Sequence, residues 1–136
     1  RRIGRREAAA AGLLVAAALT LRLYDLSSLP ADVNNDEGEH GDSGLNIVHG
    51  LPLHPGNPAV VPSPFQTGWQ TEPTGGHWLL GAVMQIAGED VFGLRLTAAL
   101  SGAAGVGLLY LLLRDWVRTS AALAAAWLLA LGHVQL

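Results

Sequence analysis

Three apolar segments alternate with polar ones along the chain. They cover residues 8–24, 91–113 and 120–136. As a helix, the first would extend about 25 Å, near the lower limit for crossing a bilayer, and the core of the second, residues 92–113, about 33 Å, enough to span it. The third begins a further span. The pattern therefore predicts an all-α integral membrane protein with multi-pass helices.

The polar stretch over residues 25–90 is predicted to be a long first external loop. Six of the seven prolines lie within residues 52–73, which excludes a long helix there. Two stretches keep a helical pattern: about 37–49, with Gly50 as a natural stop, and 74–87. The second would reach only about 21 Å, too short to span. We expect two short membrane-surface helices in this loop.

The eight basic residues are all arginine, and their positions predict the orientation. They lie in the N-terminal segment 1–7, in the connection 114–119, and at Arg22 and Arg95. Both segments fall on the cytoplasmic side after an even number of crossings. We therefore expect a plasma-membrane protein with a cytoplasmic N-terminus. A signal peptide is the alternative for the first apolar run, but no clear small-residue cleavage site follows Tyr24.

Composition removes several classes of function. Half of the residues are apolar and 14% are charged, against about a quarter charged in soluble domains. The formal net charge of −3 offers no basic face to nucleic acid. Without cysteine, the chain has no disulfides and no thiolate ligands or nucleophiles. The sequence starts with Arg1 and ends within an apolar run at Leu136, so we expect a piece of a longer protein.

The densest cluster of ionisable groups, residues 34–42, comes where the first span should leave the bilayer. Asp36 could cap the following helix, with Glu39 completing a capping box, or the cluster could be a solvated loop. A calcium loop is excluded because Glu37 stands where glycine is needed. Four histidines match no compact zinc site by spacing: His40, His49, His54 and His77. We predict no metal site, and a requirement for a divalent metal stays open.

A carboxylate held at the membrane surface can also act as a general base. Asp36 could take the proton of an acceptor hydroxyl while a polyprenyl-linked donor in the bilayer presents its sugar. The helix at about 37–49 would hold Asp36 in place. Glu37 would support it, by tuning its neighbour or by binding the acceptor.

The glycine-rich stretch 101–107 has a structural interpretation. It lacks the Gly-Lys-Ser/Thr ending of a phosphate loop. Its small residues recur on helical spacing, as in Ala98, Gly102 and Gly105, which suits close helix packing in lipid. A channel or transporter is disfavoured, because no charged residue lies deep within a predicted span.

An ordered set of short motifs covers nearly the whole chain. In chain order they are Leu21-Arg22-Leu23-Tyr24, Asp36-Glu37-Gly38, Gly44-Leu45-Asn46-Ile47-Val48-His49-Gly50, Gly68-Trp69, Glu72-Pro73, Trp78-Leu79-Leu80, Gly88-Glu89-Asp90-Val91-Phe92-Gly93-Leu94-Arg95-Leu96 and Leu109-Tyr110-Leu111-Leu112-Leu113-Arg114. Together they resemble the N-terminal part of a GT-C-type membrane glycosyltransferase. This broad group includes the dolichyl-phosphate-mannose–protein mannosyltransferases and the bacterial aminoarabinose transferases.

The resemblance implies an inverting transfer of a sugar from a polyprenyl-phosphate donor to an acceptor hydroxyl on the external face. Asp36 would be the catalytic base and Glu37 the supporting acid. The lipid bilayer and the lipid-linked sugar would be the partners, with no other cofactor identified. Arg95 matches the family's Leu-Arg-Leu, where substrate contact and anchoring of the loop are both open.

The chain departs from the family pattern at two positions. Relatives place Lys-Pro-Pro or His-Pro-Pro where this chain has Glu72-Pro73-Thr74, and those of the aminoarabinose type carry a basic residue where Glu39 stands. A carboxylate cannot meet a lipid phosphate, so His77 becomes the nearest candidate. A second class of function also fits: a non-catalytic helical accessory subunit of a larger membrane complex, which could pack through the small residues of the second span.

Overall fold

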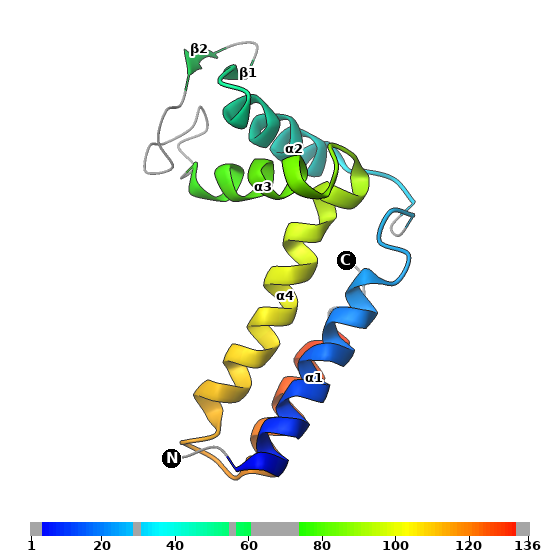
Figure 1. Ribbon diagram of the computed structural model, residues 1–136, viewed down its shortest axis with the longest axis vertical. Helices are drawn as coiled ribbons and strands as arrows, with labels where there is room; N and C mark the ends of the chain where they lie inside the picture. Colours follow the sequence, from blue (N-terminus) through cyan, green and yellow to red (C-terminus); the bar gives the residue numbers. More distant parts are fainter. Residues whose placement is uncertain (1–3, 29–30, 55–56, 61–73, 133–136) are drawn as a thin grey trace. The chain divides into compact units, whose positions relative to one another are not determined.

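The structure is a computed structural model that describes residues 4–28, 31–54, 57–60 and 74–132. These ranges hold α1 (Arg5–Leu23), α2 (Asn35–Val48), β1 (Pro52–His54), β2 (Asn57–Val60), α3 (Gly75–Ala87), α4 (Val91–Leu113) and α5 (Thr119–Gly132) (Figure 1). The chain divides into two compact units: Leu26–Thr97, and Arg1–Asp25 together with Ala98–Leu136. We call them the loop unit and the helical unit. The motifs Gly68-Trp69 and Glu72-Pro73 and the last residues of the predicted third span lie outside the described ranges.

The predicted all-α class is confirmed by the five helices, and a small β-hairpin adds to it. Strand β1 pairs antiparallel with β2, with Pro52 opposite Val60 and an irregular register between the two pairs. Proline at the first residue of a strand removes only one ladder hydrogen bond, which an edge position tolerates. The sequence interpretation excluded a long helix here but did not predict the strands.

Helix α2 begins at Asn35, two residues before the predicted start, because Asn34 caps it. The Asn34 side-chain oxygen accepts a hydrogen bond from the Glu37 backbone N–H at 2.7 Å. The interpretation of Asp36 as the cap is therefore wrong. Asp36 lies inside the first turn, where the unpaired amides of a helix N-terminus favour a negative charge.

The same helix ends where the sequence predicts a stop. Gly50 has a φ of +69°, a left-handed conformation that costs glycine little. The Gly50 N–H bonds to the Ile47 carbonyl at 3.1 Å, and the Leu51 N–H to the Asn46 carbonyl at 2.8 Å. These two bonds form the Schellman motif that satisfies the last carbonyls of the helix.

Within the loop unit, α2 and α3 lie side by side and contact each other closely (Figure 1). The closest approach is between Gly44 and Gly81. A Cβ on Gly81 would collide with the Gly44 carbonyl oxygen, and one on Gly44 would lie 3.0 Å from the Gly81 nitrogen. Ile47, which is 3% exposed, packs nearby against Trp78. Small residues at the crossing thus bring the two helix backbones together.

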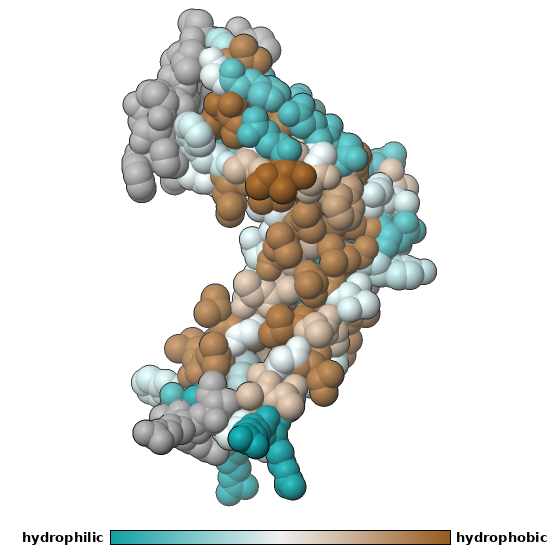
Figure 2. Space-filling view, viewed as in Figure 1, coloured by the Kyte–Doolittle hydropathy of each residue, from teal (hydrophilic) through white to brown (hydrophobic). Residues whose placement is uncertain are grey.

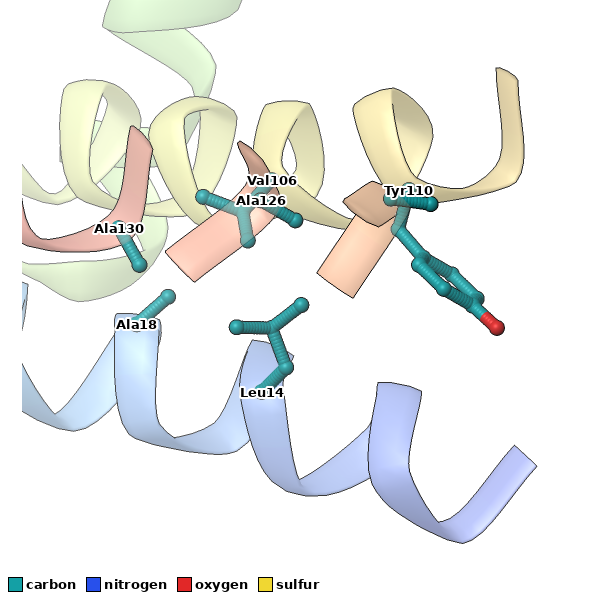
Figure 3. Close-up of a cluster of buried hydrophobic side chains, with 7 residues drawn as sticks. Leu14, Ala18, Val106, Tyr110, Ala126 and Ala130 are labelled. Carbon is teal, nitrogen blue, oxygen red and sulfur yellow. The ribbon is translucent and has the colours of Figure 1, made fainter. Parts of the chain in front are cut away.

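The helical unit has a core of alanine and larger apolar side chains from three helices (Figure 3). Its members are Leu14 and Ala18 from α1, Val106 and Tyr110 from α4, and Ala122, Ala126 and Ala130 from α5. Alanine at every fourth position of α5 forms a smooth face that α1 can approach closely. On α4 the fully buried positions include Ala99 and Ala103, whereas Ala98 of the predicted small-residue stripe is exposed.

Helices α1 and the end of α4 run antiparallel, and an ion pair joins their ends. Glu7 of α1 accepts hydrogen bonds from the Tyr110 hydroxyl at 2.8 Å and from Arg114 Nε at 2.9 Å. The Glu7 and Arg114 side chains are 12% and 6% exposed. Hydrogen bonds from Arg114 and Tyr110 lower the pKa of Glu7 from 4.5 to about 2.

By length and composition, α4 is the one described helix that could cross a membrane, and 22% of its apolar window is buried. Helix α5 is apolar but shorter, and α1 carries charged residues at both ends. Figure 2 shows apolar residues over the surface of α4. Four leucines of the helical unit are 64–72% exposed: Leu13, Leu108, Leu112 and Leu128. An apolar surface of this extent is rare on soluble monomers and suits lipid.

Candidate functional site

The loop unit carries the acidic pair Asp36-Glu37 in the first turn of α2. The Asp36 side chain is exposed, whereas Glu37 is partly buried. Consecutive residues of a helix lie about 100° apart around its axis, so the two carboxylates face different surroundings. The structure therefore separates two acids that are adjacent in the sequence.

Glu37 is held by Arg95, which lies near the start of α4. Arg95 Nε donates to Glu37 Oε1 at 2.8 Å, and Nη2 donates to Oε2 at 3.3 Å. This two-point geometry is the strongest arrangement for a guanidinium and a carboxylate. Arg95 is only 6% exposed, so the pair is largely shielded from water.

The same guanidinium also ties down the segment that leads into α2. Arg95 Nη1 donates to the Leu26 carbonyl at 3.1 Å, and Nη2 to the Asp32 carbonyl at 3.3 Å. Of the two roles that the sequence left open, these contacts are those of an anchor for the loop. One side chain from α4 thus holds both the segment before α2 and the first turn of α2.

A histidine pair joins α2 to α3. His40 Nδ1 lies 3.0 Å from His77 Nε2, and the two ring centroids are 5.1 Å apart with the planes tilted by 50°. One ring must donate and the other accept, so the contact holds with at most one of the two imidazoles protonated. His40 follows Asp36 by four residues and lies on the same side of α2. The two histidines are 37 residues apart, so no sequence motif indicates that they pair.

An open groove of about 910 Å³ runs along α2. It is lined by Val33, Asn34, Asn35, Gly38, Glu39, Asp42, Ser43, Leu45, Asn46, His49 and Glu89. Most of these residues recur at intervals of three or four, so they form one face of the helix. At one end, His49 Nε2 lies 3.0 Å from Glu89 Oε1. The lining combines carboxylates with amides and contains no arginine or lysine.

Within the described ranges, no group of three or more histidine, aspartate or glutamate side chains could hold a metal ion. His40 and His77 form a pair, and His49 pairs with Glu89 instead.

Comparison with known families adds an independent observation. Residues 71–135 match the dolichyl-phosphate-mannose-protein mannosyltransferase family. The resemblance that the sequence motifs indicate is thereby confirmed. No curated protein and no solved structure matches the chain.

The mannosyltransferase match covers α3, α4 and α5 and therefore includes His77 and Arg95. Asp36 and Glu37 precede the matched segment. The family and the apolar helix α4 together indicate a membrane protein of the glycosyltransferase class. The ion pair between Glu37 and Arg95 joins the matched segment to the acidic pair outside it.

Proposed function

We propose that this chain carries the catalytic base of a GT-C-type glycosyl transfer, with Asp36 as that base. The observation that carries the proposal is that the two acids in the first turn of α2 have different surroundings. Arg95 neutralises and holds Glu37, whereas Asp36 remains exposed. A base must reach the proton that it removes, and an exposed carboxylate on a fixed helix turn meets that requirement.

In the proposed reaction, a polyprenyl-phosphate sugar is the donor and a hydroxyl group is the acceptor. Asp36 takes the hydroxyl proton as the acceptor oxygen attacks the anomeric carbon from the face opposite the phosphate. The bond between the anomeric carbon and the phosphate oxygen breaks, and polyprenyl phosphate leaves with the electron pair. The configuration at the anomeric carbon inverts. Asp36 contributes general-base catalysis, an effect of about 10²–10⁴ in rate.

Glu37 and Arg95 act in this proposal through position and not through contact with the substrate. Arg95 binds Glu37 at two points and also binds two backbone carbonyls of the preceding segment. These contacts fix the start of α2 against that segment. The supporting role that the resemblance implies for Glu37 thus becomes an anchoring role. A fixed base loses less entropy on the way to the transition state.

His77 is our proposed contact for the donor phosphate in the loop unit. It pairs with His40, which lies one helical turn from Asp36, and the N–H of a histidine ring can donate a hydrogen bond to a phosphate oxygen. A polyprenyl donor needs its phosphate near the base, because the reacting anomeric carbon is bonded to that phosphate. This proposal explains how the site works without the basic residue that relatives carry near Glu72.

The groove along α2 is our proposed place for the acceptor. Glu39, Asp42 and the neighbouring amides can accept and donate hydrogen bonds to a hydroxyl-bearing ligand. Asn35, which precedes Asp36, lines the groove. In the topology that the arginines predict, the loop unit faces the exterior of the plasma membrane and the N-terminus is cytoplasmic. Helix α1 joins α4 as a span, and α5 begins a third.

The proposal is tested by Asp36→Asn in the full-length protein, with Asp115→Asn as control. Asp115 is an exposed acid in the connection between α4 and α5, outside the proposed site. We expect Asp36→Asn to lower the transfer rate from a radiolabelled polyprenyl-phosphate sugar by about 10² or more at unchanged expression. Wild-type rates in Asp36→Asn would refute the catalytic assignment and favour the accessory-subunit hypothesis.

A further inference from the structure

Arg22, in the last turn of α1, is a partly buried cation without an anion among the described residues. Its Nη1 donates to the Ala18 carbonyl at 3.1 Å, but its Nε is buried and has no hydrogen-bond partner. The two most buried arginines, Arg95 and Arg114, each bind a glutamate. A guanidinium carries five N–H donors, and shielding it from water without an acceptor is unfavourable. Arg22 therefore has unused capacity for an anion.

Gly102 of α4 provides the space in which this guanidinium lies. A Cβ at position 102 would fall 2.6 Å from Arg22 Nε and 3.3 Å from Arg22 Cδ. Any larger residue would displace the side chain. Three residues further along α4, Gly105 has nothing within 4 Å of the same hypothetical atom. The glycine at 102 thus has a specific packing role that Gly105 does not share.

Two features select phosphate as the anion. The planar fork of arginine matches phosphate oxygens at two points, and the guanidinium is weakly hydrated enough to bind them at an apolar boundary. Leu21, the residue before Arg22 on α1, is 49% exposed, so an incoming ligand with an apolar tail would find apolar surface beside the charge. A lipid phosphate has both parts.

We propose that Arg22, cradled by Gly102, binds the phosphate group of a membrane lipid. The proposal goes beyond the proposed function, in which His77 of the loop unit contacts the donor phosphate, because Arg22 belongs to the helical unit. It rests on the proposed function only for the identity of that lipid. Polyprenyl phosphate and ordinary phospholipid share the chemistry, and the experiment separates them.

The test measures lipid binding to the full-length protein in neutral detergent by native mass spectrometry. The probes are decaprenyl phosphate, the uncharged alcohol decaprenol, and phosphatidylglycerol. The variants are Arg22→Gln, Arg22→Lys, Gly102→Ala and the matched control Gly105→Ala. Gel filtration and thermal unfolding verify that each variant folds.

We expect Arg22→Gln to weaken decaprenyl phosphate binding by about tenfold or more, which is the loss of a charged hydrogen-bond pair. Arg22→Lys should retain part of the affinity, because it keeps the charge and loses the fork. Gly102→Ala should weaken binding and Gly105→Ala should not. Decaprenol should bind weakly and without dependence on Arg22.

Unchanged binding in Arg22→Gln would overturn the proposal, as would equal effects of the two glycine variants. If phosphatidylglycerol binds as tightly as decaprenyl phosphate and also depends on Arg22, the phosphate site stands and belongs to the bulk lipid. A preference for decaprenyl phosphate assigns the site to the sugar carrier. Asp36→Asn provides the separation from the proposed function. If that variant keeps transfer activity while Arg22→Gln loses lipid binding, the base assignment fails and the phosphate site stands.

Discussion

The loop unit and the helical unit each contain an ion pair between a buried arginine and a glutamate, but the two pairs have different structural roles. Arg95 and Arg114 lie near the two ends of α4, are each 6% exposed, and bind a glutamate through Nε at 2.8 and 2.9 Å. In the helical unit, the partner Glu7 belongs to a neighbouring helix that an apolar core already holds. In the loop unit, Arg95 also binds two backbone carbonyls of an irregular segment.

This difference shows where each unit obtains its order. The helical unit has a core of seven buried apolar residues, so Glu7 and Arg114 secure the ends of helices that packing has already paired. In the described part of the loop unit, the corresponding cluster is Ile47 with Trp78. Polar contacts and glycine contacts therefore carry more of the structure there. The proposed catalytic residue lies in the unit with the smaller core.

The largest effect should come from removing the anchor of the loop unit. Arg95→Ala leaves Glu37 partly buried without its cation and frees two carbonyls, which should cost about 3 kcal/mol of unfolding free energy. Chemical unfolding in detergent, followed by tryptophan fluorescence, measures it. If most of this loss comes from the ion pair, adding Glu37→Gln to Arg95→Ala should lower the unfolding free energy little further. Two fully additive losses would contradict the coupling.

A smaller effect should follow from separating α2 and α3. A Cβ at Gly81 collides with the Gly44 carbonyl, so Gly81→Ala should cost about 2 kcal/mol and separate the histidine pair. Gly76→Ala is the matched control, because it lies on the same helix with nothing within 4 Å. Thermal unfolding gives the cost, and histidine NMR titration reports the pair. Equal stability of the two variants would contradict the close crossing.

The smallest effect should be the dependence of the helical unit on pH. The folded pKa of Glu7 is about 2, below its ordinary value of 4.5, so the ion pair stabilises fully above pH 4.5. That contribution should disappear as the pH falls from about 4.5 to 2. Glu7→Gln should be less stable at pH 7 and should lose less of its remaining stability over that range. Parallel melting-temperature curves for the two proteins would exclude Glu7 as the source.

Local signals predicted much of the secondary structure, because those signals act within a few residues. The two helices of the loop were expected at about 37–49 and 74–87, and α2 and α3 span Asn35–Val48 and Gly75–Ala87. The stop at Gly50 follows from its left-handed backbone. The start was misassigned to Asp36, since aspartate and asparagine are both good caps and composition does not choose between them. Asn34 lies at the position whose side chain reaches the Glu37 N–H.

The candidate site shows the limit of that reasoning. The acidic pair Asp36-Glu37 was visible as a dipeptide, but its division into one anchored and one exposed acid required Arg95, 58 residues from Glu37. The motifs point to His77 as a candidate for phosphate binding, but they give no sign of its partner His40. A pair of this kind depends on the crossing of two helices, which no local pattern specifies. The role of Asp36 stays a prediction that Asp36→Asn tests, and the membrane topology stays a prediction.

The sequence by itself determined where the helices lie, which stretch is apolar enough to cross a membrane, and which family the chain resembles. These properties depend on periodicity, composition and short motifs, all of which are read along the chain. Only the tertiary structure decided which acid meets Arg95, which histidines pair, and that Arg22 lies in the space left by Gly102. Those contacts join residues 37 to 80 positions apart. They arise because glycine and alanine let helix backbones approach, and approach of the backbones decides which polar side chains can touch.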